Sequence, residues 1–158
     1  MSLTVTAPLD GDVVALEDVP DPVFSGRMLG SGAAIEPAEG ATEVLVVAPV
    51  AGRLAKVHPH AFIVVDDAGN GVLVHLGINT VRLHGKGFTL AAAEGDQVAA
   101  GDPVVTFDPT AARAAGMSAL CPVVVMQNPA VDTTPAAAPG SRVRRGEPLF
   151  AWTTTPGA

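Results

Sequence analysis

Short valine-rich runs, separated every few residues by glycine or proline, constrain this chain more than any other feature. The 17 glycines and 14 prolines are spread over all 158 residues. Many short strands with turn residues between them are typical of an all-β sandwich or barrel. The pattern therefore predicts an all-β, antiparallel fold. The runs are residues 3–7, 44–47, 62–65, 72–78, 104–107, 123–126 and 149–152.

Helix signals are few. The clearest stretch is residues 110–115, with Asp108 as a possible N-cap, Pro109 at the first helical position and Gly116 as the stop. A second short turn is predicted at residues 21–25. The segment 129–139 is rich in Ala, Pro and Thr and is predicted to be an exposed loop. We expect only short helices.

Two sequence motifs each occur twice. The motif A-P-x-x-G at residues 7–11 recurs 41 residues later at 48–52, and V-x-x-G-[DE]-P at residues 98–103 recurs 45 residues later at 143–148. Each motif is a turn beside a strand. Such turn sequences can recur independently, but two pairs in one short chain favour a duplication. We expect duplicated hairpin motifs that close on one another and leave little exposed edge.

The charge and the single cysteine limit the classes of function. Nine Lys and Arg against 16 Asp and Glu give a net charge of −7, which argues against a broad surface for nucleic acid or anionic membrane. Cys121 has no cysteine to pair with, and we expect it to be a small buried apolar residue. No apolar run reaches the roughly 18 residues that span a bilayer, and no signal segment precedes the first run. We expect a soluble, cytoplasmic protein.

Four histidines are the candidate reactive groups: His58, His60, His75 and His84. Strand alternation over residues 71–78 places His75 and Gly77 on one face, opposite the aliphatic one. Because Gly77 has no side chain, a ligand or a partner's backbone could come close to the imidazole.

His60 follows Pro59, which holds its neighbours in an extended stretch. The runs 62–65 and 72–78 are expected to form a hairpin, so that His60 and His75 approach the same region, although the register is open. One neutral imidazole, with an ordinary pKa of ~6.5, can then take a phosphoryl group while its neighbour hydrogen-bonds the phosphate oxygens. The competing use is a metal site, because His58-x-His60 puts two imidazoles on one face and imidazole binds zinc.

The chain resembles the glucose-type enzyme IIA proteins of the bacterial phosphoenolpyruvate-dependent sugar phosphotransferase system. The resemblance runs from about residue 5 to residue 150, and Met1 at the start favours a protein that stands alone. It implies one enzyme IIA domain over residues 1–158, with a core at about 5–150 and a tail at 151–158. The motifs that carry it are E-D-V-P-D-P-V-F at 17–24, A-P-V-x-G at 48–52, H-A-F at 60–62, V-H-L-G-I-N-T-V at 74–81, G-x-G-F at 85–88, and E-G-D-Q-V at 94–98 with Gly101.

The resemblance implies that the chain is a phosphotransferase working through a phosphohistidine, without a cofactor. His75 would accept the phosphoryl group on Nε2 from the phosphocarrier HPr and pass it to the IIB domain of a sugar permease, with His60 supporting the phosphate. An apolar rim of Phe24, Phe62 and Val81 would dock both partners, and Asp21 would meet their arginines. Such a carrier is expected to be monomeric and not embedded in a membrane.

Two positions depart from the family's pattern. The family usually has Asp where this chain has Asn79, and the lost charge should ease the approach of a dianionic phosphate but weaken pairing with a basic partner. The family commonly has Thr where this chain has His58, which could orient the imidazole of His60 in its place. His84 is expected to lie in a surface loop without a role.

Three alternatives are open. A lysostaphin-type zinc peptidase would need an Asp near position 79 and a late His-x-His, but no histidine follows His84, so only adventitious zinc at His60 and His75 is expected. A biotinyl or lipoyl carrier would present a lysine at a hairpin tip, and neither Lys56 nor Lys86 has that setting. A regulatory paralogue of the same fold, weak in catalysis, is the third.

Overall fold

The computed structural model describes residues 2–126 and 133–153, and almost all of its regular structure is β-strand. The strands are β1 (Ser2–Thr6), β2 (Gly11–Ala15), β3 (Ser31–Glu36), β4 (Val44–Val47), β5 (Gly52–His58), β6 (Ala61–Val65), β7 (Gly71–His75), β8 (Phe88–Leu90), β9 (Gln97–Val98), β10 (Pro103–Phe107), β11 (Cys121–Val125), β12 (Thr133–Pro135), β13 (Arg142–Val143) and β14 (Pro148–Thr153). The helical segments are α1 (Pro22–Ser25), α2 (Pro109–Ala114) and the 3-10 turns η1 (Leu16–Asp18) and η2 (Thr80–Leu83).

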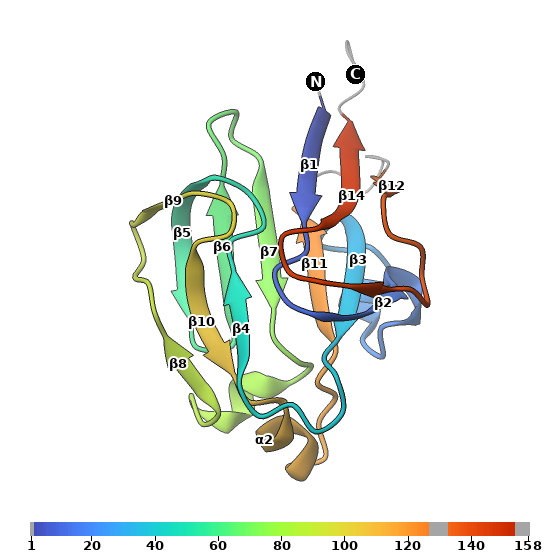
Figure 1. Ribbon diagram of the computed structural model, residues 1–158, viewed down its shortest axis with the longest axis vertical. Coiled ribbons are helices and arrows are strands. Elements are labelled where there is room, and N and C mark those ends of the chain that lie inside the picture. Colours follow the sequence, from blue (N-terminus) through green and yellow to red (C-terminus); the bar gives the residue numbers. More distant parts are fainter. Residues whose placement is uncertain (1, 127–132, 154–158) are drawn as a thin grey trace.

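The strands form three antiparallel sheets, and the order of strands in the large sheet is nearly symmetric about its central pair, β11 and β7. The large sheet runs β13-β2-β3-β11-β7-β6-β5-β9, and two small sheets run β1-β14-β12 and β4-β10-β8. Figure 1 shows one small sheet on each side, both lying over the large sheet. The two halves meet where β11 pairs with β7. The predicted antiparallel all-β fold with duplicated hairpin motifs is therefore confirmed, and it is a sandwich.

The repeated turns occupy equivalent places in the two halves. Thr6 N–H donates to the carbonyl of Pro49 (3.0 Å), and Val47 N–H donates to the carbonyl of Pro8 (2.8 Å). Each turn also receives the same pair of bonds from a later hairpin: Ala7 exchanges main-chain hydrogen bonds with residues 146 and 147, as Ala48 does with residues 101 and 102. The repeated motifs are thus bonded to one another across the molecule.

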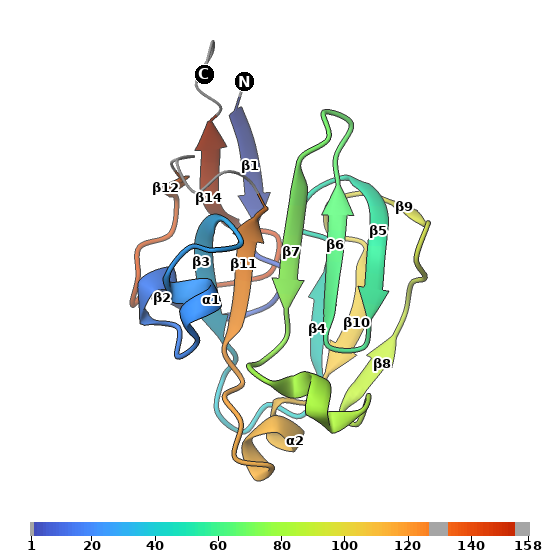
Figure 2. The ribbon, with the colours of Figure 1, turned by 180° about the vertical axis from the view of Figure 1, so that it is seen from behind.

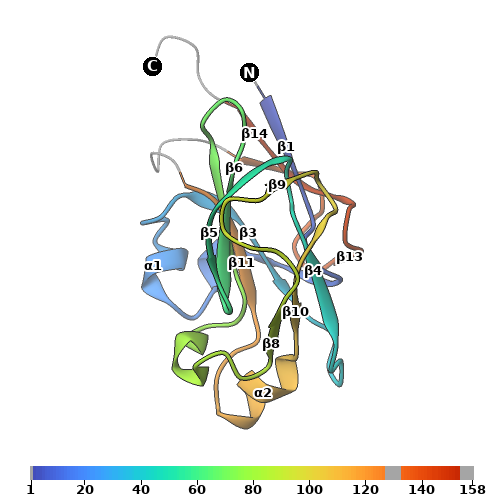
Figure 3. The same cartoon turned by 90° about the vertical axis from the view of Figure 1, so that its left-hand side faces the viewer.

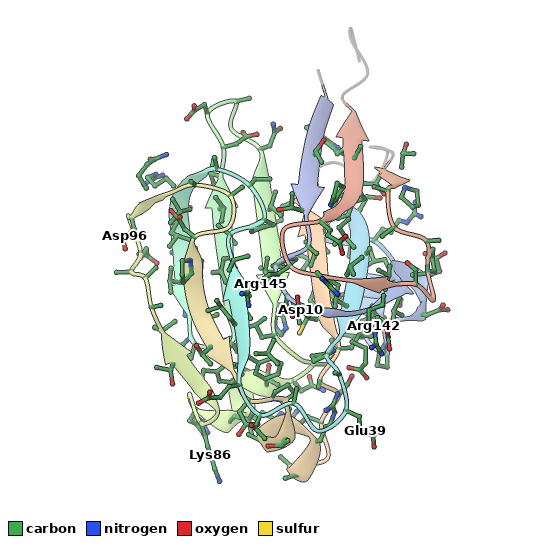
Figure 4. The ribbon with its side chains drawn as sticks, in the orientation of Figure 1. Asp10, Glu39, Lys86, Asp96, Arg142 and Arg145 are labelled. Carbon is green, nitrogen blue, oxygen red and sulfur yellow. The ribbon has the colours of Figure 1, made fainter. Side chains whose placement is uncertain are left out.

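The two turns differ mainly in their charged side chains. In the first half the backbone N–H of Arg145 donates to Oδ1 of Asp10 (2.7 Å), and Figure 4 shows the two residues side by side near the middle of the view. Arg142 also pairs with Asp12 at an exposed edge (3.3 Å). The equivalent turn of the second half carries Ala99 and Ala100 instead of Arg144 and Arg145. The backbone arrangement therefore does not depend on these arginines.

Two apolar clusters hold the fold together. The inner core lies between the large sheet and the small sheets and includes Leu54, Phe62, Phe107 and Trp152. The outer cluster lies on the opposite face of the large sheet and contains Leu16, Val19, Phe24, Ala34, Ala61, Leu73, Ile78, Leu120 and Val124. Because β11 is covered on both faces, all of its residues are buried, which explains its continuous apolar sequence.

The helical segments around the outer cluster matter for function. Figure 2 shows α1 in front of β3 and β11, and the coil of η2 directly below β7. In Figure 3 α1 and this coil lie on the same side of the molecule, away from β4 and β10. The predicted helices are confirmed to within a residue or two: Asp21 and Asp108 cap α1 and α2, and a proline follows each cap.

Some predicted boundaries were wrong. The run 72–78 is a strand only as far as His75, because Gly77 has a φ of +81° and turns the chain. Residues 151–153 are not a tail but the end of β14, paired with β1, and residues 154–158 lie outside the described residues. Within the predicted loop 129–139, Thr133–Pro135 is strand β12, and residues 129–132 lie outside the described residues.

The valine runs did not reveal every strand. The longer strands that they missed are β2, β3 and β5, whose sequences mix Ala, Gly and charged residues with few large apolar ones. Among the helices of the described residues, none combines the length and apolar character that crossing a bilayer requires.

Candidate active site

His75 is the last residue of β7, where the chain leaves the large sheet. It pairs with Ala61 at the start of β6, and its side chain is only partly exposed. Its Nδ1 lies 2.6 Å from the carbonyl oxygen of Gly77. A carbonyl only accepts hydrogen bonds, so Nδ1 carries the proton in the neutral ring. The lone pair of the neutral imidazole therefore lies on Nε2.

His60 lies in the two-residue turn between β5 and β6. Its carbonyl accepts a hydrogen bond from the N–H of Leu76, the residue after His75 (2.7 Å), so the two histidine segments are tied together through the backbone. The ring centroids of His60 and His75 are 5.3 Å apart, and the rings meet edge to face at 73°. The predicted approach of the two histidines is present in the structure.

His58 forms the end of β5 and stacks on His60, with ring centroids 5.8 Å apart and 26° between the planes. It is exposed, whereas His60 is partly covered. This contact can limit the rotation of the His60 ring. No hydrogen bond joins the two side chains, so His58 would orient His60 by packing alone.

The first half of the chain supplies one wall of the site through α1. The ring of Phe24 meets that of His75 edge to face, with centroids 5.4 Å apart and 61° between the planes. Asp21 caps α1 by accepting a hydrogen bond from the N–H of Val23 (2.9 Å). Phe24 is only 6% exposed, so it forms the buried wall of the site rather than an exposed rim.

Both imidazoles favour the neutral form. Burial lowers the pKa of His75 below 6.5, although the hydrogen bond to Gly77 and the negative charge of Asp21 oppose this. Burial also lowers the pKa of His60, and the neighbouring His75 and His58 lower it further. A neutral ring at physiological pH has a free lone pair, so His75 can act as a nucleophile through Nε2.

The structure corrects three expectations. Gly77 leaves no space for a ligand, because a Cβ on it would lie 2.5 Å from Cγ2 of Thr80 and 2.9 Å from the carbonyl oxygen of Ser118. Phe62 is 1% exposed and belongs to the inner core, because on β6 its side chain points between the sheets. Ile78 belongs to the outer cluster with Leu73, so strand alternation does not continue beyond the turn.

The other predicted residues lie on the surface. Val81 is 59% exposed on η2, and Asn79 precedes η2 in a left-handed conformation with φ of 64°. His84 is also exposed and left-handed, at the end of η2, as expected for a surface loop. Among the side chains that the structure describes, in residues 4–126 and 133–152, the only large apolar ones besides Val81 that are exposed are Val23, Met28 and Leu90.

One buried residue of the site was missed by sequence reasoning. Thr80 is fully buried, and its hydroxyl donates to the carbonyl of Leu76 (2.6 Å). Cys121 is buried as expected, which raises the pKa of its thiol to about 12, and the thiol donates a hydrogen bond to the carbonyl of Ala119 (3.2 Å). A polar Thr within the apolar sequence of residues 76–81 was the one available signal.

The donor set does not form a metal centre of the usual kind. Within the part of the chain that the structure describes, no group of three or more His, Cys, Asp or Glu side chains is arranged to hold a metal ion. A structural or catalytic zinc site needs at least three protein ligands. The geometry instead offers one nucleophilic nitrogen and one neighbouring imidazole that can donate or accept a hydrogen bond.

Comparison with known proteins agrees with this geometry. The family model described as the phosphoenolpyruvate-dependent sugar phosphotransferase system, EIIA 1, matches residues 3–131. A glucose-specific EIIA component of Bacillus cereus is 39% identical over 82% of this chain and 78% of its own length. The solved glucose permease IIA from Mycoplasma capricolum has a TM-score of 0.82 and 33% identity, over 96% of both chains.

The chain also matches part of a much longer relative. The glucose-specific EIICBA component of Streptococcus pneumoniae is 48% identical over 84% of this chain, which spans only 18% of that relative. The extent of these matches, over most of the chain and with the histidine segments included, settles the family. The chain belongs to the EIIA 1 family of the phosphoenolpyruvate-dependent sugar phosphotransferase system.

Proposed function

We propose that this chain, a phosphoryl carrier of the sugar phosphotransferase system, takes up its phosphoryl group on Nε2 of His75. The hydrogen bond between Nδ1 of His75 and the Gly77 carbonyl carries the proposal, because it leaves the lone pair on Nε2 (2.6 Å). Burial keeps the pKa of the ring low, so the nucleophilic form prevails at neutral pH. Among the described residues, none hydrogen-bonds the ring of His60 in a way that would select its tautomer.

In the transfer step the lone pair of Nε2 forms the bond to phosphorus while the bond between phosphorus and the donor atom breaks. The bonding electron pair leaves with the donor. The positive charge that develops on His75 is stabilised by the Gly77 carbonyl at Nδ1, and no proton has to leave. Onward transfer reverses these roles, with the acceptor's nucleophile attacking phosphorus and Nε2 as the leaving group.

His60 is proposed to steady the phosphoryl group. Its ring meets that of His75 edge to face, with the ring centroids 5.3 Å apart. At that separation it can reach the oxygens of a phosphoryl group bound to Nε2 of His75. A dianionic phosphoryl group beside the ring would raise the pKa of His60, so that it can donate a charge-assisted hydrogen bond. His60 should matter most for the step in which the phosphoryl group leaves.

The donor is proposed to be HPr and the acceptor the IIB domain of a sugar permease, in the cytoplasm. The exposed apolar residues Val23, Met28 and Val81 lie on α1, just after it and on η2, the segments that flank the histidines. These side chains, with Asp21, are the proposed docking surface. The names of the relatives in Bacillus cereus and Streptococcus pneumoniae favour glucose as the sugar that the system takes up.

The test uses purified protein with phosphoenolpyruvate, enzyme I and HPr, followed by mapping of acid-labile phosphate by mass spectrometry. We expect one phosphate on His75, no labelling of His75→Gln, and labelling of His60→Gln that is not passed to a IIB domain. His84→Gln is the matched control and should behave as the wild type. Labelling of His75→Gln together with loss of labelling in His60→Gln would reverse the two roles.

Asn79 offers a second test of the docking proposal. It is exposed beside the site, so Asn79→Asp adds a negative charge without disturbing the core. Binding of a basic partner should become tighter and more sensitive to salt, by about threefold at low ionic strength. An unchanged salt dependence would place the docking surface elsewhere.

A further inference from the structure

Several main-chain polar groups of the turn that follows His75 are hydrogen-bonded. The N–H of Leu76 donates to His60 O (2.7 Å), and the N–H of Ile78 donates to Ser118 O (2.9 Å). Between them, the Gly77 carbonyl accepts a hydrogen bond from Nδ1 of His75 (2.6 Å). The carbonyl of Leu76 accepts a hydrogen bond from the hydroxyl of Thr80 (2.6 Å).

Thr80 touches this turn with both branches of its side chain. Its hydroxyl holds the Leu76 carbonyl, and its methyl lies where a side chain on Gly77 would be, 2.5 Å from the position of a Cβ. Thr80 is itself 0% exposed, so water cannot replace the hydroxyl. The Leu76 carbonyl belongs to the same peptide group as the Gly77 N–H, and its orientation therefore limits where the Gly77 carbonyl can point.

We propose that Thr80 is a positioning residue for phosphoryl transfer: its hydroxyl, through the Leu76 carbonyl, holds the turn in the one orientation in which Gly77 accepts the Nδ1 proton of His75. The inference rests on the proposed role of His75 and extends it to a buried residue that touches neither phosphate nor partner. Without the hydroxyl, the buried Leu76 carbonyl loses its hydrogen-bond donor, and the peptide group between Leu76 and Gly77 can rotate. The Nδ1 proton then loses its partner, and the tautomer with the proton on Nε2, which has no lone pair there, becomes populated.

Thr80→Val tests this, because it removes the hydroxyl and keeps the shape. We expect phosphorylation to slow by about 10–100-fold, the range for disturbed support of a reactive group. Thr80→Ser keeps the hydroxyl and should restore most of the rate. The matched control is Thr6→Val, which removes a partly buried hydroxyl that donates to the Pro49 carbonyl (3.0 Å) in another part of the fold.

The decisive measurement is made on unphosphorylated protein, by two-bond proton–nitrogen correlation spectra of the His75 ring. The wild type and Thr80→Ser should have the proton on Nδ1, and Thr80→Val should shift toward the Nε2-protonated form. The hydrogen bond to Gly77 raises the pKa of His75. Its loss in Thr80→Val should therefore lower that pKa. A slow Thr80→Val with an unchanged tautomer and pKa would mean a merely structural role and would overturn the proposal.

Two further outcomes also bear on the proposed role of Thr80. If Thr80→Val does not fold, the wild-type and Thr80→Ser spectra remain, and an Nε2-protonated ring in either would overturn the proposal. If the wild type shows no phosphate on His75, the proposed function fails, whereas the tautomer comparison still tests Thr80 independently. A wild-type rate in folded Thr80→Val would contradict the positioning role directly.

Discussion

The two halves of this molecule share a scaffold but not a chemistry. Strands β1 and β2 of the first half correspond to β4 and β5 of the second, and β12, β13 and β14 correspond to β8, β9 and β10. The same main-chain hydrogen bonds join the repeated turns in both. Yet all four histidines belong to the second half. The difference teaches that the sandwich can be built without the site.

The difference arises in two connections between strands. In the second half, β5 and β6 are joined by the short turn that holds His60. In the first half, the connection from β2 to β3 is long, and it forms η1 and α1, which cover His75 with Phe24. The first half therefore contributes the wall of the site and the second half its reactive groups.

Removal of that wall should give the largest effect. Phe24→Ala empties a nearly buried site in the outer cluster and should lower the free energy of unfolding by about 3–5 kcal/mol. Because burial is the main cause of the low pKa of His75, this pKa should rise toward its ordinary value. Chemical denaturation and an NMR titration measure the two effects.

Phe88→Ala is the matched control for Phe24. The Phe88 ring is partly buried and stacks on Phe107, with centroids 5.1 Å apart, at the edge of the inner core and away from α1. It should lower stability without moving the pKa of His75. Equal pKa changes in both variants would show that the wall contributed by the first half has no special influence on the histidine.

Truncation of core side chains in equivalent strands tests whether the two halves contribute to stability in the same way. Leu54 on β5 and Val13 on β2 are equivalent, 41 residues apart, and both lie in the inner core. Leu54→Ala should cost about 2–5 kcal/mol in denaturant unfolding, and Val13→Ala about 1–3 kcal/mol because the side chain is smaller. A loss below about 1 kcal/mol for either would break the equivalence.

Equivalent turn glycines should give nearly equal, smaller losses. Gly101 and Gly146 have φ of +94° and +89°, and no atom lies within 4 Å of a Cβ on either. Alanine at each position should therefore cost about 1–2 kcal/mol through backbone strain alone. Gly71→Ala is the control, because its Cβ would make ordinary contacts and its φ is not positive, so thermal unfolding should hardly change. Clearly unequal losses at the two turns would argue against their equivalence.

The smallest expected effect is a pH dependence confined to the second half. The pKa values of His60 and His75 are lowered on folding, so at mildly acidic pH the unfolded chain binds more protons than the folded one. Their contribution to stability is present above the unfolded value of ~6.5 and is lost as the pH falls through the lower folded values. A His60→Gln, His75→Gln double variant should lose less stability than the wild type between pH 7 and pH 5. An equal loss would assign the pH dependence to other groups.

The sequence by itself determined the architecture and the identity of the reactive groups. The local signals were the valine runs between glycines and prolines, the two repeated turns, and the Asp cap followed by proline at the start of α1 and of α2. Each of them acts within a few residues. The structure agrees with them, and the antiparallel sandwich and the pairing of repeated turns follow from them. The histidines were equally visible, because His60 and His75 flank one hairpin.

Only the tertiary structure decided which groups surround the reactive nitrogen. The turn at Gly77 breaks strand alternation, so Ile78 lies in the outer cluster and not on the face that alternation assigns to it. Phe62, expected on a docking rim, points into the inner core from β6. The hydroxyl of Thr80 holds the Leu76 carbonyl across this turn, and the ring of Phe24 reaches that of His75 from α1. Such contacts depend on how β7, β11 and α1 pack in space, and packing between distant segments leaves no periodic signal in the chain.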